Sequence, residues 1–170
     1  MSTKEHKLNT SQRFNVGIIT VSTTRTMETD KSGAWISKLI KKEGHYLQAY
    51  VVIPDDSETI INTVKSFVHE QKVQVIIITG GTGISPDDVT IETVCPLFEK
   101  ELTSFGSIFA MLSFKQIDSA AILSRSTAGV IDKSILFCIP GSLNAVKLAC
   151  IEIIFPELGH IMKHIFQNQG

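Results

Sequence analysis

The sequence predicts a three-layer α/β/α domain with a mainly parallel sheet, and three observations support this fold class. Short apolar segments rich in Val and Ile alternate with segments whose apolar residues recur at helical spacing. Several of the strand-like segments are uninterruptedly apolar, as in strands buried on both faces. No internal repeat or low-complexity segment breaks the alternation over the 170 residues. We therefore expect a single domain at residues 14–170, preceded by a disordered tail at residues 1–13.

The first half of the chain contains three predicted strands separated by two predicted helices. A helix is expected at residues 31–43, where Gly44 provides a stop. Ser57 is expected to cap a second helix, whose positive end is favoured by the carboxylates of Asp56 and Glu58. The strands of this half are expected at residues 14–21, 46–53 and 74–79.

The second half continues the alternation less regularly. Thr90 is expected to cap a helix that runs to about Lys100 and is bent or ended near Pro96. Ser142 is expected to begin the last long helix. The remaining predicted elements are a helix at 104–114, strands at 128–131 and 135–139, and a short helical tail at 156–166.

The composition is that of an ordinary soluble globular protein. Hydrophobic residues make up 43%, charged residues 19%, and the formal net charge is -1. This balance argues against nucleic acid as a partner, and the absence of a long apolar run argues against a membrane partner. The start of the sequence has no apolar targeting segment, and the three cysteines lack metal-site spacing. We expect a cytoplasmic protein in which all three cysteines are buried thiols.

Three predicted strand ends carry unusual residues, at 54–56, 80–88 and 140–142. In open α/β sheets, ligands bind beyond the carboxyl ends of the strands. The loop TGGTGISPDDVT, residues 79–90, has glycines that allow backbone N–H groups to approach phosphate oxygens, and the helix after Thr90 would add positive dipole. The residues expected to contribute these N–H groups are Gly80, Gly81, Thr82 and Gly83.

Two adjacent carboxylates, Asp87 and Asp88, follow this glycine-rich segment. They would repel a bare phosphate, so their presence beside a phosphate site suggests Mg²⁺ between them and the ligand. The alternative is that the loop is only a flexible turn and the aspartates are solvated charges at a helix start. The loop alone leaves both interpretations open.

Residues 79–90 resemble the signature of the MoaB/MogA family of molybdenum cofactor biosynthesis. Five further motifs, in the family's order, resemble its MoaB branch, and the resemblance extends from about residue 14 to residue 160. These motifs are TDKSG at 29–33, FGSIFAMLS at 105–113, LSR at 123–125, PGS at 140–142 and PELGH at 156–160.

The resemblance implies a molybdopterin-binding fold that assembles as a homotrimer or homohexamer. In catalytic members, the terminal phosphate of molybdopterin attacks the α-phosphorus of Mg-ATP, which yields adenylylated molybdopterin and pyrophosphate. The adenylate then passes to a molybdenum insertase. By position in the motifs, the resemblance assigns catalysis and metal binding to Asp55 and Asp88. It assigns pterin or nucleotide binding to Gly80, Gly81, Thr82, Gly83, Ser124, Arg125, Gly141 and Ser142.

Some residues keep two interpretations. Arg125 is expected either to face a developing charge or to hold its loop through an ion pair. The apolar segment 105–112 is expected in the core or at a subunit interface. His160 and His164 are spaced to bind a metal, but a packed or solvated helix end is the favoured interpretation.

The sequence departs from the family pattern at three places. Asp87 stands where an arginine is usual, Thr23 stands where many members have an aspartate, and Ser142-Leu143 replaces Asn-Pro or Ser-Pro. The presence of Asp55 and Asp88 favours an enzyme, a molybdopterin adenylyltransferase. The change at Asp87 favours a non-catalytic MoaB-type protein that binds molybdopterin or a partner. A generic nucleotide-binding protein is a third, weaker hypothesis.

Overall fold

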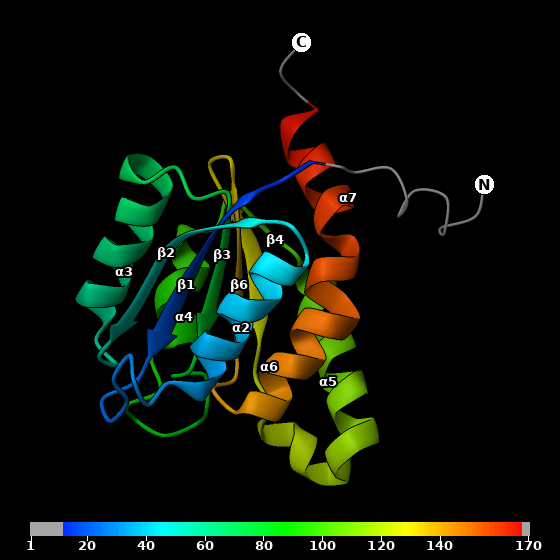
Figure 1. Cartoon of the computed structure of the whole chain (residues 1–170). Coiled ribbons are helices and arrows are strands. Elements are labelled where there is room, and N and C mark those ends of the chain that lie inside the picture. Colours follow the sequence, from blue (N-terminus) through cyan, green and yellow to red (C-terminus); the bar gives the residue numbers. More distant parts are fainter. Residues whose placement is uncertain (1–11, 168–170) are drawn as a thin grey trace, which may run out of the picture.

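The computed structural model describes residues 12–167, so the predicted tail lies almost entirely outside the described residues (Figure 1). A six-stranded sheet runs through it in the order β2-β1-β3-β6-β5-β4. Strands β2, β1, β3 and β6 are parallel, whereas β5 is antiparallel to β6 and β4 is antiparallel to β5. The prediction of a mainly parallel sheet is therefore confirmed. The strands are β1 (Asn15–Val21), β2 (Tyr46–Ile53), β3 (Val75–Thr79), β4 (Lys100–Glu101), β5 (Thr127–Ile131) and β6 (Ser134–Ile139).

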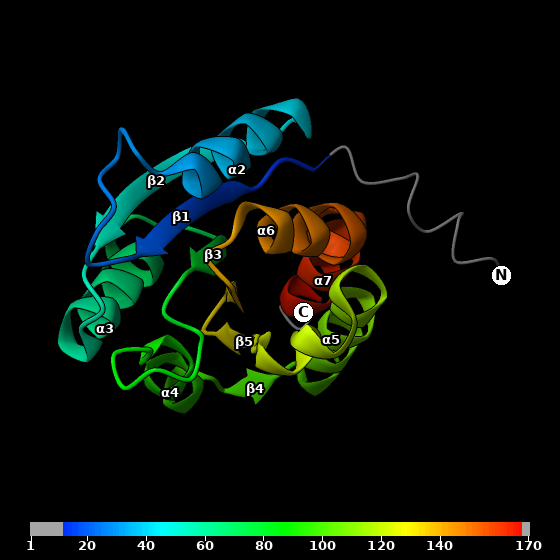
Figure 2. The same ribbon diagram turned by 90° about the horizontal axis from the view of Figure 1, so that it is seen from below.

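Helices cover both faces of the sheet, which confirms the three-layer architecture (Figures 1 and 2). On one face lie α2 (Lys31–Lys42), α5 (Thr103–Ile117), α6 (Leu143–Ala149) and α7 (Phe155–Phe166), and on the other lie α3 (Ser57–Lys65) and α4 (Thr90–Val94). Alternate strand residues enter the two apolar layers: Ile77 packs with the first group of helices, while Ile76 and Ile78 pack with the second. Within residues 12–167, no helix is long and apolar enough to cross a membrane.

Short irregular helical segments connect or extend several of these helices. A π-helical segment joins α6 to α7, so the predicted last helix and its tail form one continuous helical rod. This joining segment is Cys150–Ile154, and the other segments are π-helical Ser66–Glu70 after α3, 3₁₀ Cys95–Leu97 after α4 and 3₁₀ Asp118–Leu123 after α5.

The capping predictions are partly confirmed. Ser142 caps α6, because its Oγ accepts a hydrogen bond from the Ala145 N–H at 3.3 Å. The cap of α3 is Asp56 rather than Ser57, since the Asp56 carboxylate accepts the Thr59 N–H at 2.8 Å. Aspartate and serine are both good N-caps, so two adjacent candidates could not be separated by residue type.

The helix predicted from Thr90 ends near Pro96, as expected, and does not continue to Lys100. Helix α4 ends at Val94, and a 3₁₀ turn containing Pro96 follows, because proline cannot supply the N–H that would continue the helix. The chain then becomes extended and forms β4, which pairs with β5. Thr90 is also not the cap: Val89 occupies that position.

The buried-cysteine prediction holds for Cys138 and Cys150, whereas Cys95 is only partly buried. All three are free thiols. Burial raises the pKa of the Cys150 thiol to about 12, so it stays protonated at neutral pH.

The topology brings four loops together. The chain passes from β1 to β2 on one side, and then places β3 on the other side of β1, so the crossover direction reverses between β1 and β3. Because β1, β2, β3 and β6 are parallel, their carboxyl ends share one edge of the sheet. Such a reversal point is where open α/β sheets bind ligands.

Candidate functional site

A cleft of about 390 Å³ lies at this edge of the sheet. The loops after β1, β2, β3 and β6 all contribute to its wall, as the predicted convergence of strand ends requires. Its lining residues are Val21, Ser22, Arg25, Asp55, Gly80, Gly81, Thr82, Gly83, Asp88, Leu123, Pro140, Gly141 and Ser142. Of the residues that the sequence assigned to the site, Ser124 and Arg125 are absent from this lining.

The two glycines after β3 are required by the packing of their own loop. Gly80 and Gly81 have φ angles of +100° and +62°, which residues with a Cβ rarely adopt. A Cβ on Gly80 would collide with the Val21 carbonyl oxygen, and one on Gly81 would collide with the Thr90 hydroxyl. The sequence suggested that these glycines allow a ligand to approach. In the structure, close contacts within the protein already require a glycine at both positions.

Three of the four predicted N–H donors remain available to a ligand. The Gly80 N–H donates to the Ile139 carbonyl at 3.1 Å and so joins the loop to β6. The N–H groups of Gly81, Thr82 and Gly83 form no hydrogen bond within residues 12–167. Successive unpaired N–H groups of this kind can bind an anion.

The contribution expected from the helix after Thr90 is smaller than the sequence suggested. Helix α4 has only five residues, and the Thr90 N–H already donates to the Gly81 carbonyl at 2.9 Å. The Thr90 hydroxyl donates to the Gly80 carbonyl at 3.0 Å. Thr90 therefore holds the glycine loop in shape, and the helix dipole is a minor factor.

Both predicted carboxylates flank this loop. Asp55 Oδ2 accepts a hydrogen bond from the Thr23 hydroxyl at 2.8 Å, while its Oδ1 faces Gly81. Asp88 Oδ2 lies beside Gly83 and accepts the Ser85 N–H at 2.9 Å. Asp87 is exposed and does not line the cleft.

The residues fit a cation that is shared with a ligand rather than a cation enclosed by protein. Within residues 12–167, no three His, Cys, Asp or Glu side chains are arranged to hold a metal. Mg²⁺ in proteins is commonly held by one or two carboxylates together with water and substrate phosphates. Asp55 and Asp88 match that ligand set. His160 and His164 contact each other on the exposed side of α7, with 2.9 Å between their Nε2 atoms.

Two residues near the cleft were not assigned to it from the sequence. Arg25, in the loop after β1, donates from Nη1 to the Gly141 carbonyl at 3.1 Å. Asp30 is buried and caps α2, where it accepts hydrogen bonds from the Thr20 and Tyr50 hydroxyls at 2.5 and 2.6 Å and from the Gly33 N–H. The position of Asp30 directly before a predicted helix indicates a helix cap. Neither residue was assigned to the site, because the strand ends expected to form it were those at 54–56, 80–88 and 140–142 and not the end of the first strand.

The chain is similar to known proteins over nearly its whole length. A family model described as "Probable molybdopterin binding domain" matches residues 17–160. The chain belongs to this molybdopterin-binding family. It is 45% identical over 170 residues to Molybdenum cofactor biosynthesis protein B of Bacillus subtilis (strain 168), covering 99% of this chain and 100% of that protein.

Two solved structures confirm the MoaB-type fold. A crystal structure of Molybdenum cofactor biosynthesis protein B has a TM-score of 0.90 and 42% identity, covering 93% of this chain and 99% of that one. The tungsten cofactor synthesizing protein MoaB from Pyrococcus furiosus has a TM-score of 0.82 and 38% identity, covering 92% and 99%. The predicted resemblance and fold class are thus confirmed.

Arg125 forms an ion pair outside the lining of the cleft. The Arg125 guanidinium forms an ion pair with Glu92, which ties the segment after α5 to α4. This geometry agrees with the ion-pair interpretation of Arg125. Leu123, two residues earlier, is the residue of the LSR motif that lines the cleft.

Proposed function

We propose that this MoaB-type chain acts in molybdenum cofactor biosynthesis, where it binds molybdopterin in the cleft and transfers AMP to it from Mg-ATP. An oxygen of the terminal phosphate of molybdopterin forms a bond to the α-phosphorus of ATP. The bond between that phosphorus and the oxygen bridging to the β-phosphate breaks, and pyrophosphate leaves with the electron pair. The adenylate then passes to a molybdenum insertase.

The backbone and side-chain groups of the cleft suit this reaction, because phosphoryl-type transfer needs positioning and charge neutralisation rather than a protein nucleophile. The N–H groups of Gly81, Thr82 and Gly83 donate to phosphate oxygens and orient them. Asp55 and Asp88 would hold Mg²⁺, which would offset the negative charge of the phosphates. Gly141 and Ser142 also line the cleft, with Gly141 beside Gly80.

The observation that supports the proposal most is the pairing of unbonded N–H groups with two carboxylates in one cleft. The N–H groups favour an anion and the carboxylates disfavour it, unless a cation accompanies the anion. A metal-bound nucleotide meets both conditions.

A second candidate is a non-catalytic protein that binds molybdopterin or a partner. It is favoured by Asp87, an exposed acid where the family usually has an arginine.

The deciding experiment is incubation of the purified protein with molybdopterin, ATP and Mg²⁺, followed by mass spectrometry. The adenylyltransferase proposal predicts adenylylated molybdopterin and an equal amount of pyrophosphate. Retention of molybdopterin without formation of the adenylate would establish the binding protein instead.

A further inference from the structure

We propose that Arg25 is the residue that anchors a substrate phosphate group in the cleft. This role deepens the proposed function and rests on it for the identity of the phosphate-bearing substrate. It differs from the sequence-based interpretation, in which Arg125 was the candidate cation.

The charge balance of the cleft is the first argument. Among the described residues that line it, Asp55 and Asp88 are the acids and Arg25 is the single lysine or arginine. A substrate with several phosphate groups therefore meets one fixed positive side chain. Arg125 cannot share this task from its present position, because it is paired with Glu92 and lies outside the lining.

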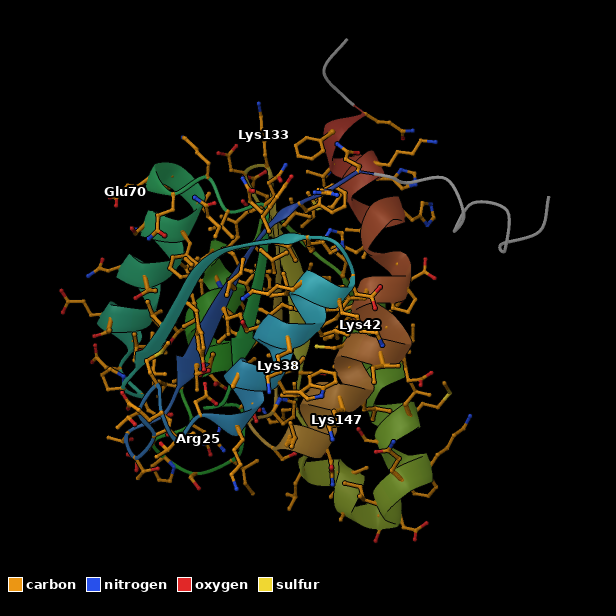
Figure 3. All side chains as sticks on the ribbon, in the orientation of Figure 1. Arg25, Lys38, Lys42, Glu70, Lys133 and Lys147 are labelled. Carbon is orange, nitrogen blue, oxygen red and sulfur yellow. The ribbon has the colours of Figure 1, made fainter. Side chains whose placement is uncertain are left out.

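The Arg25 side chain is held in place while most of its donors remain unused. Its Nη1 donates to the Gly141 carbonyl at 3.1 Å, and its backbone N–H donates to Ser22 Oγ at 3.2 Å. A guanidinium has five N–H donors, so one hydrogen bond leaves an edge for a phosphate. The side chain is 35% exposed, and a ligand can therefore reach it. Figure 3 shows Arg25 apart from three labelled lysines, which are Lys38 and Lys42 on α2 and Lys147 on α6.

The buried carboxylate of Asp30 forms only a long ion pair with Arg25. Asp30 already accepts hydrogen bonds from Thr20, Tyr50 and the Gly33 N–H at 2.5–3.0 Å. Its Oδ1 is 4.0 Å from Arg25 Nη1, beyond hydrogen-bond distance. Asp30 thus orients Arg25 electrostatically, and the guanidinium keeps its capacity to bind a second anion.

The test is calorimetric titration of the full-length protein with inorganic pyrophosphate at one fixed Mg²⁺ concentration for all variants, so that the carboxylates of Asp55 and Asp88 do not repel the anion. The parent is expected to bind, and Arg25→Gln to weaken the affinity by about 10- to 100-fold, the effect of losing a charged hydrogen-bond donor. Glutamine can still donate to the Gly141 carbonyl, which preserves the loop. Arg25→Lys should recover part of the affinity, because it keeps the charge without the planar fork.

Arg13→Gln is the matched control. Arg13 is also exposed, but it lies before β1 and contacts the Tyr46 hydroxyl at 3.3 Å, at the opposite edge of the sheet. Its substitution should leave pyrophosphate affinity unchanged. Thermal unfolding of each variant separates a lost contact from a lost fold.

Three results would overturn the role of Arg25: no pyrophosphate binding by the parent, equal affinity in Arg25→Gln, or a loss confined to Arg125→Gln. The adenylylation assay keeps this inference separate from the proposed function. If the parent forms the adenylate while Arg25→Gln retains its pyrophosphate affinity, only the Arg25 inference fails. If Arg25→Gln loses affinity but the parent forms no adenylate, the anchor stands and the enzyme proposal fails.

Discussion

Asp88 is the residue whose replacement tests the proposed chemistry most directly. Its side chain is partly exposed and, among residues 12–167, forms a hydrogen bond only with the Ser85 N–H, which an asparagine oxygen can also accept. We expect Asp88→Asn to fold normally but to lower turnover by about 10²- to 10³-fold, the effect of removing one preorganised electrostatic contact. Asp55→Asn should act in the same direction. Initial rates of adenylate formation with saturating Mg²⁺ measure both effects.

Asp87→Asn is the internal control for that measurement. Asp87 neighbours Asp88 but is exposed and does not line the cleft. Turnover should stay unchanged, or rise slightly as repulsion of the phosphates decreases. An essential Asp87 together with a dispensable Asp88 would show that the motif has been placed one residue off.

Asp30 gives a prediction about pH and stability. Burial alone would raise the pKa of its carboxyl, but hydrogen bonds from Thr20, Tyr50 and Gly33 and the charge of Arg25 outweigh burial and hold the pKa below its ordinary value. A lowered folded-state pKa means that the ionised carboxylate stabilises the fold above the unfolded-state pKa of about 4. That stabilisation is lost as the pH falls through the folded-state pKa.

Asp30→Asn should therefore destabilise the protein by about 1–3 kcal/mol at pH 7, through loss of charge-assisted hydrogen bonds. The difference between parent and variant should shrink as the pH falls below about 4. Chemical denaturation at pH 7, 5 and 3.5 measures it, with the exposed Asp87→Asn as reference. A difference that stays constant over this range would show that Asp30 is not stabilised as an anion.

At the scale of elements, the β3–α4 loop depends on a close contact between glycine and threonine. Gly81 has a positive φ and no room for a Cβ beside Thr90, whereas Gly44, after α2, has a positive φ of +84° and open space around it. Gly44→Ala should cost only the backbone strain of about 1–2 kcal/mol. Gly81→Ala should cost at least about 1 kcal/mol more, because the Thr90 hydroxyl must move.

Thermal and denaturant unfolding of the two alanine variants provide the comparison. Equal losses of stability would mean that the loop relaxes around the added methyl group. The same result would show that the contact with Thr90 does not by itself require a glycine at position 81.

The sequence predicted those elements whose signals are local. Strand β3 is a continuous apolar run, and α2 has apolar residues at helical spacing followed by Gly44, so both were placed within one residue of their bounds. Strand β4 has two exposed residues, Lys100 and Glu101, and exists only because it pairs with β5. No pattern in two residues can reveal such pairing.

The same distinction applies to the site. The glycine loop, Asp55 and Asp88 stood in recognisable motifs at strand ends and do line the cleft. Arg25 joins them through a hydrogen bond to Gly141, which lies 116 residues later in the chain. Arg125 carries the same charge in a recognised motif, yet its ion pair with Glu92 keeps it elsewhere. Long-range contacts of this kind are set by the fold, and the spacing of residues along the sequence does not reveal them.

At the scale of the whole molecule, helix α5 has apolar residues on both of its sides. Phe105 and Phe109 are buried against the sheet, so part of segment 105–112 belongs to the core. On the other side of the helix, large apolar residues are 42–56% exposed, and the following 3₁₀ segment adds two more. These residues are Ile108, Met111, Phe114 and Ile117 on α5, and Ile122 and Leu123 after it.

An exposed apolar patch is typical of a protein interface, and the homotrimer or homohexamer implied by the family resemblance remains a prediction. Leu123 also lines the cleft, so a neighbouring chain that binds this patch would reach the edge of the site.

Light scattering should give a mass three or six times that of the 18.7 kDa chain. Met111→Glu and Phe114→Glu should shift the mass toward the monomer, since each buries an unpaired charge in the interface. Ile151→Glu is the matched control, because Ile151 is also 50% exposed but lies between α6 and α7. A parent that is monomeric at micromolar concentration would remove the assembly, whereas dissociation by Ile151→Glu alone would move the interface to the α6–α7 junction.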